Sequence, residues 1–162
     1  MNRTKLITMM AMLTAIGVVG SQFVWFPAGV ARAYPVQHAV NVVAAVMLGP
    51  LPAIGVAFMI ALVRNLLGIG TLLAFPGSMI GAFLAGVLYK KTSRLSLAAA
   101  GEVAGTGLIG ALTAVPVAKV LMGTAFAAWF FIPPFLISSL SGALLGWLLL
   151  ARLNQSTYTQ LQ

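Results

Sequence analysis

The 162-residue sequence contains no cysteine, only one acidic residue (Glu102) and only one histidine (His38). Without cysteine the chain has no disulfide, no thiolate nucleophile and no thiolate metal ligand. One histidine and one carboxylate are too few side chains for a zinc site. These absences predict a protein that holds no metal, has no catalytic residues and is not an enzyme.

Charged residues are scarce as well, at 6% of the chain, whereas 61% of the residues are hydrophobic. A soluble domain typically has about a quarter of its residues charged, so a soluble fold is excluded. A membrane-crossing helix needs roughly 20 apolar residues, which leaves room for about five or six crossings. We therefore expect an all-α, polytopic integral membrane protein, a six-helix bundle forming a single domain over residues 1–162.

The order of apolar runs and their interruptions sets approximate helix bounds. Pro35 suits the first turn of the second helix. The first run is longer than a signal-peptide core of about 7–15 residues, so we expect it to be retained as a helix. The expected helices cover approximately residues 5–25, 35–48, 53–67, 78–89, 97–122 and 133–153.

The second and third helices are short, at about fifteen residues each. Either the bilayer thins around them or their outer ends stop inside the membrane. We favour the second alternative, in which loops 26–34 and 68–77 lie on the same side and cover a cavity. The sequence thus predicts a lidded pocket at the outer face.

The net charge of +8 comes from nine basic residues and one acid. In a soluble protein this balance would suggest nucleic acid, but here no nucleic-acid partner is expected, because the basic residues gather at the ends of apolar runs. Cytoplasmic loops of membrane proteins collect lysine and arginine. With both termini inside, six of the nine fall on the cytoplasmic side: Arg3, Lys5, Lys90, Lys91, Arg94 and Arg152.

Two nucleotide-binding motifs are missing or out of context. There is no G-x-x-x-x-G-K-[ST] phosphate loop, so any ATP-driven process needs a partner. Gly105–Gly110 matches G-x-G-x-x-G, but a dinucleotide site requires a preceding strand, which is not expected. The spacing Gly101-xxx-Gly105 instead favours close helix packing. Ala11 and Ala15 have the same spacing, which by itself favours internal packing.

The stretch Val63–Gly81 carries polar residues, glycines and a proline within an apolar region. Non-helical chain at membrane depth must face protein or a wet cavity. Arg64 costs several kcal/mol in an apolar helix unless it is paired, hydrated or at the interface. Two roles stay open for Arg64, a ligand contact or a hydrogen bond to loop carbonyls.

Polar and aromatic residues near the expected outer loops are the candidates for binding a small molecule. For Trp129 an interfacial aromatic belt is the alternative, and for His38 we expect hydrogen bonding rather than catalysis. Glu102 is expected near the start of the fifth helix, toward the face opposite His38, with a ligand contact as the alternative. The candidates are Tyr34, Gln37, His38, Asn41, Arg64, Asn65, Phe75, Ser78, Trp129 and Ser138.

These features resemble the substrate-binding (S) components of energy-coupling factor (ECF) vitamin transporters. Shared features are six helices, the pair Ala11 and Ala15, and the turn Leu48-Gly49-Pro50. The chain is most similar to the ThiW family, the S components expected to bind the thiazole precursor of thiamin. The stretches that carry this similarity are Ala33–His38, Arg64–Gly68 with Thr71–Ser78, and Gly101–Val103 with Gly105–Gly107.

The resemblance implies capture of hydroxyethyl-thiazole at the outer face of a prokaryotic cytoplasmic membrane, without a cofactor. It also implies docking through Ala11 and Ala15 on an EcfT-type membrane scaffold subunit that carries two ECF ATPase subunits. Arg32 and Arg64 leave open another vitamin-like, anionic or phosphorylated ligand. A secondary transporter or an intramembrane enzyme using His38 and a serine are further alternatives, but the chain shows no internal repeat and has one acid only.

Overall fold

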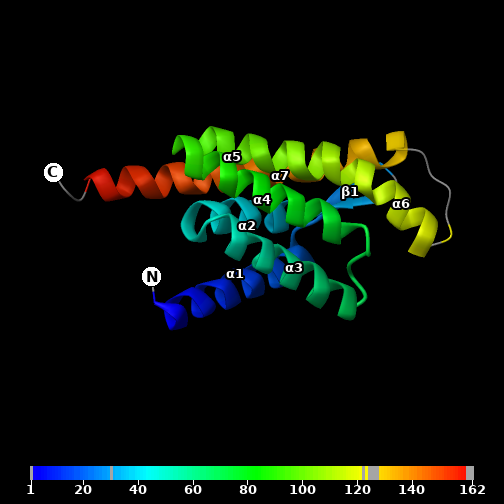
Figure 1. The fold of residues 1–162 in the computed structure, drawn as a ribbon, viewed down its shortest axis with the longest axis horizontal. Coiled ribbons are helices and arrows are strands. Elements are labelled where there is room, and N and C mark those ends of the chain that lie inside the picture. Colours follow the sequence, from blue (N-terminus) through cyan, green and yellow to red (C-terminus); the bar gives the residue numbers. More distant parts are fainter. Residues whose placement is uncertain (1, 30, 122, 124–127, 160–162) are drawn as a thin grey trace.

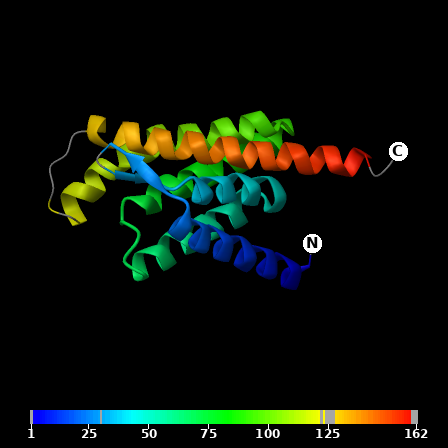
Figure 2. The same ribbon diagram turned by 180° about the vertical axis from the view of Figure 1, so that it is seen from behind.

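The computed structural model describes residues 2–29, 31–121, 123 and 128–159. Its helices form an elongated bundle with both chain ends at one end of the molecule (Figures 1 and 2). A small antiparallel hairpin of β1 and β2 lies toward the opposite end, as does the connection between α3 and α4. The elements are α1 (Arg3–Phe23), β1 (Phe26–Ala28), β2 (Ala31–Ala33), α2 (Pro35–Leu48), α3 (Pro50–Leu66), α4 (Ala74–Thr92), α5 (Leu95–Glu102), η1 (Val103–Gly110), α6 (Ala111–Leu121) and α7 (Ala128–Thr159).

The elements α5, η1 and α6 form one continuous helical rod of 27 residues, Leu95–Leu121. Counting this rod once, the described residues form six helices. Three of them are long and apolar enough to cross a membrane: α1, the rod, and the Trp129–Leu153 part of α7. The apolar helices α2 and α3 are shorter, at 14 and 17 residues. The all-α membrane architecture expected from the sequence is confirmed.

Helix ends differ from the sequence-based bounds mainly where proline is present. The helix α4 begins at Ala74 rather than at residue 78, so Phe75-Pro76-Gly77 lies in its first turn. Proline is tolerated there because the first N–H groups of a helix have no intrahelical partner. The helix α7 also starts earlier than expected, at Ala128 rather than at residue 133, so Pro133 and Pro134 lie inside it. The predicted end of the fifth helix, Met122, lies outside the described residues.

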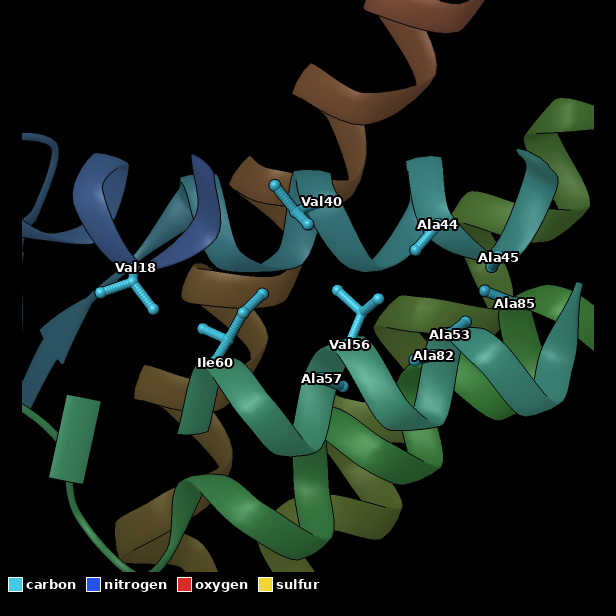
Figure 3. Close-up of a cluster of buried hydrophobic side chains, with 10 residues drawn as sticks. All are labelled: Val18, Val40, Ala44, Ala45, Ala53, Val56, Ala57, Ile60, Ala82 and Ala85. Atoms are coloured by element: carbon cyan, nitrogen blue, oxygen red, sulfur yellow. The ribbon is translucent and has the colours of Figure 1, made fainter. Parts of the chain in front are cut away.

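The core between α1, α2, α3 and α4 is built from small side chains (Figure 3). Of the ten buried residues drawn there, six are alanine, and the largest side chain is that of Ile60. Lipid tails are as apolar as leucine, so helices in a membrane associate through close van der Waals packing, which small residues permit. The short α2 is held by this packing on one side and by α7 on the other.

Glycines bring α4 into backbone contact with the rod. A Cβ atom added at Gly105 would lie 2.6 Å from the Cα atom of Gly81, and one added at Gly101 would lie 2.9 Å from the backbone nitrogen of Ala85. Such distances leave no room for a side chain. The glycines of the G-x-G-x-x-G match therefore pack one helix against another.

Candidate ligand-binding pocket

A cavity of about 730 Å³ lies at the end of the bundle opposite the chain termini. Its wall comes from the β1–β2 hairpin, α2, the end of α3, the α3–α4 connection, α4, η1, α6 and α7. This volume falls within the range of about 300–1,000 Å³ that is usual for small-molecule sites. Six of the residues predicted from the sequence line the cavity: Tyr34, Gln37, His38, Arg64, Ser78 and Ser138.

The start of α2 brings three of these side chains to the cavity. Tyr34 directly precedes the helix, Pro35 occupies its first turn, and Gln37 and His38 lie two and three residues after Pro35. The backbone N–H of Tyr34 donates a hydrogen bond to Oγ of Ser138 on α7, at 2.9 Å. This bond joins the end of the hairpin to α7, and so fixes where α2 begins beside the cavity.

Arg64 is 2% exposed and organises the α3–α4 connection. One terminal guanidinium nitrogen donates to Oε1 of Gln37, and the other donates to the carbonyl oxygen of Ile69 at 3.2 Å. The guanidinium group also lies 3.7 Å above the centre of the Tyr34 ring. The Arg64 carbonyl accepts from the N–H groups of Ile69 and Gly70, at 3.0 Å each. Arg64 therefore lines the cavity and also binds a loop carbonyl, so the two roles left open by the sequence are compatible.

Glu102 lies in the middle of the bundle, and its predicted position away from His38 is wrong. Its side chain is fully buried, and Oε1 lies 2.8 Å from Nδ1 of His38. Oε1 also accepts from Nδ2 of Asn41 and Oγ1 of Thr106, both at 3.0 Å. With a rise of about 1.5 Å per residue, Glu102 lies roughly 10 Å along the rod from Leu95, well away from the basic residues around Arg94.

Composition carried one signal that Glu102 and His38 are partners, although it could not decide their contact. A buried carboxylate needs donors or an opposite charge, and the chain has a single histidine and a single acid. Nothing in the sequence marked Thr106 as a candidate. In the structure it lines the cavity, and its hydroxyl also approaches the carbonyl oxygen of Gly77 at 3.1 Å. It lies within η1, a stretch of π-helix, which is a rare form that is frequent at functional sites.

Four residues predicted from the sequence do not line the cavity. Asn41 is buried and binds Glu102 and the carbonyl oxygen of Ser78. Asn65 donates to the carbonyl oxygens of Ala61 and Thr71, at 2.8 and 3.1 Å, and so supports the α3–α4 connection. The Phe75 ring packs against Phe58 with centroids 5.6 Å apart. Trp129 is 81% exposed, which suits the interfacial aromatic belt.

Three aromatic rings of α7 complete the cavity wall, and Trp129 is not one of them. Phe130, Phe131 and Phe135 all line the cavity, and the Phe131 and Phe135 rings pack edge to face with centroids 6.4 Å apart. Arg32 lies at the exposed side of the cavity, with its guanidinium carbon 4.2 Å from the centre of the Trp25 ring. The cavity thus combines aromatic surface with a few polar groups.

The cations Arg32 and Arg64 line the cavity, whereas Glu102 does not. The described residues contain no group of three or more His, Asp or Glu side chains that could hold a metal ion. The cavity wall therefore offers aromatic surface, hydrogen-bonding groups and two cations.

A family model described as "Thiamine-precursor transporter protein (ThiW)" matches residues 7–156, which is most of the chain. No curated protein and no solved structure gives a significant match.

Proposed function

Because the chain belongs to the ThiW family of thiamine-precursor transporters, we propose that it is the substrate-binding S component of an ECF-type importer. In this proposal it captures hydroxyethyl-thiazole at the outer face of a prokaryotic cytoplasmic membrane. The family is one of transporters, not of enzymes. The observation that carries the proposal is the cavity at the end of the bundle away from both termini.

The distribution of charge supports an outward-facing cavity. Lys90, Lys91 and Arg94 lie where α4 ends and α5 begins, at the same end of the bundle as the two termini (Figure 1). Basic residues mark the cytoplasmic side of membrane proteins. The hairpin, the α3–α4 connection and the cavity then face outward, where a substrate-capturing subunit needs its site.

The lining suits a small aromatic alcohol. Hydroxyethyl-thiazole offers an aromatic ring, a ring nitrogen that accepts a hydrogen bond and one hydroxyl group. Rings of Tyr34, Phe131 and Phe135 provide surface for stacking or edge contacts. Arg64 and His38 supply polar groups close to them. A small number of placed polar groups in a largely apolar wall is typical of such sites.

Calorimetric titration of the purified protein in detergent tests the ligand. Hydroxyethyl-thiazole, its phosphate and thiamin are titrated in parallel, and we expect the neutral thiazole to bind at least about tenfold more tightly than the other two. Preference for the phosphate would favour an anionic ligand, for which Arg32 and Arg64 are the supporting observation. Failure of all three to bind would overturn the thiazole assignment.

The docking surface in this proposal is a shallow apolar groove between α1 and α3. Ala11 and Ala15 are both exposed there, and Gly55 of α3 lines the groove with them. Small residues on an exposed helix face let another helix approach closely. We propose that this groove receives the EcfT-type scaffold subunit that carries the two ECF ATPase subunits.

Replacing Ala11 and Ala15 with tryptophan tests the groove. We expect ATP-dependent uptake in cells that also produce the scaffold and ATPase subunits to fall at least about tenfold, because the bulky rings prevent close helix contact. Thiazole binding by the purified double variant should stay unchanged. Leu148→Trp, at an exposed position of α7, is the matched control. Uptake by vesicles that contain this chain alone would instead indicate a secondary transporter.

A further inference from the structure

The two ring nitrogens of His38 have different surroundings. His38 lines the cavity and is 7% exposed, while Nδ1 lies 2.8 Å from Oε1 of Glu102. Glu102 is fully buried and does not line the cavity. The carboxylate therefore contacts the histidine ring from behind the cavity wall, and Nε2 is the nitrogen left for a ligand.

The groups around Glu102 indicate which ring nitrogen of His38 carries a hydrogen. Besides His38, Oε1 accepts from Nδ2 of Asn41 and from Oγ1 of Thr106. The Asn41 amide also donates to the Ser78 carbonyl, which fixes its orientation because a carbonyl only accepts. Because Oε1 already accepts from these two donors, the geometry favours Nδ1 of His38 as a third donor, with its hydrogen directed at Oε1. Only a ring with hydrogen on Nδ1 and none on Nε2 leaves Nε2 with a lone pair that can accept a hydrogen bond.

Most hydroxyl hydrogens around the cavity are already used. Ser78 donates to the Ala74 carbonyl at 2.7 Å, and Tyr34 donates to the Ile69 carbonyl at 3.3 Å. Thr106 has both Glu102 and the Gly77 carbonyl within reach. By contrast, Nε of Arg64 is buried and has no hydrogen-bond partner among the described residues.

We propose that Glu102 is a positioning residue that holds His38 as the neutral Nδ1–H tautomer, so that Nε2 accepts the hydroxyl hydrogen of the ligand. This inference rests on the proposed function, and it adds which ligands the site distinguishes. The site takes a free alcohol and rejects analogues in which the hydroxyl hydrogen is replaced. A site built to hydrogen-bond a hydroxyl discriminates well because its buried polar group is otherwise left unpaired.

The wild-type protein provides the first test. Hydroxyethyl-thiazole is compared with its O-methyl ether, which keeps the ring and the oxygen but lacks the hydrogen. We expect the ether to bind at least about tenfold more weakly, because Nε2 then faces an oxygen lone pair. Equal or tighter binding of the ether would overturn the proposal.

The second test reads the tautomer directly and needs no ligand. His38 is the only histidine, so protein labelled with ¹⁵N-histidine gives one pair of ring-nitrogen signals. We expect hydrogen on Nδ1 and a lone pair on Nε2. Hydrogen on Nε2, in a neutral or a charged ring, would overturn the proposal whether or not the thiazole binds. Failure of the thiazole to bind a protein with the Nδ1–H ring would count against the proposed function alone.

Variants of Glu102 separate positioning from general structural support. In Glu102→Gln an amide oxygen still accepts from Nδ1, so we expect the same tautomer and most of the affinity. In Glu102→Leu the acceptor is lost, and we expect hydrogen on Nε2 and about tenfold weaker alcohol binding. Loss of affinity in both variants with an unchanged tautomer would overturn the positioning role. If Glu102→Leu does not fold, the comparison of alcohol and ether still decides.

Discussion

Replacing Arg64 with methionine is expected to weaken thiazole binding at least about 100-fold, the range found for central, buried arginines at binding sites. Methionine approximates the length of the apolar stem but removes every donor. The Gln37 amide oxygen then loses its Arg64 donor, and the Ile69 carbonyl keeps only the Tyr34 hydroxyl. The Tyr34 ring also loses the guanidinium above it. Because buried polar groups left unpaired are costly, the α3–α4 connection should also move from its place over the cavity.

Two further variants calibrate the Arg64 experiment. Arg64→Lys keeps the charge but not the planar fork that reaches Gln37 and Ile69 together, so we expect an intermediate loss of affinity. Arg152→Met removes an exposed arginine of α7 and should leave binding unchanged. Titration calorimetry measures all three variants. Wild-type affinity in Arg64→Met would show that the guanidinium neither contacts the ligand nor holds the connection in place.

Replacing Gly105 with leucine is expected to destabilise the folded protein by about 3 kcal/mol or more, at the upper end of the cost of overpacking. A Cβ atom at this position lies 2.6 Å from Cα and 2.8 Å from the backbone nitrogen of Gly81. Backbone atoms in a helix cannot rotate away, so α4 and η1 must separate. The separation would also pull Glu102 and Thr106 from their positions beside α4.

Thermal unfolding in detergent measures the effect of Gly105→Leu, and for a chain of this size the expected loss corresponds to a Tm about 10 °C lower. Leu108→Phe is the matched control, because Leu108 is 46% exposed on the same π-helical stretch, so a larger ring there can be accommodated at the surface. An unchanged Tm in Gly105→Leu would contradict the backbone contact between the two helices.

The residues that line the cavity come from distant parts of the chain. This distance limited how many of them could be predicted from the sequence. Tyr34, Gln37, His38, Arg64, Ser78 and Ser138 were identified as polar or aromatic residues near predicted loops, and all six line the cavity. Asn65 and Phe75 met the same criterion, but Asn65 binds the carbonyl oxygens of Ala61 and Thr71, and Phe75 packs against Phe58. Polarity near a loop identifies a candidate, but the direction of a side chain depends on how its helix is rotated.

Membrane class and helix number are local properties, and the sequence alone determined them. The near absence of charge, the length of the apolar runs and the first-turn prolines depend only on neighbouring residues and on the thickness of a bilayer. The contact of His38 with Glu102, by contrast, is not a local property, because the two residues lie 64 positions apart in the sequence. It requires that α2 and the rod lie at matching depth and rotation. Glycines of α4 permit this arrangement, because they let the rod come into backbone contact with α4. Only the tertiary structure could decide that contact, because depth and rotation follow from packing between helices rather than from the composition of either one.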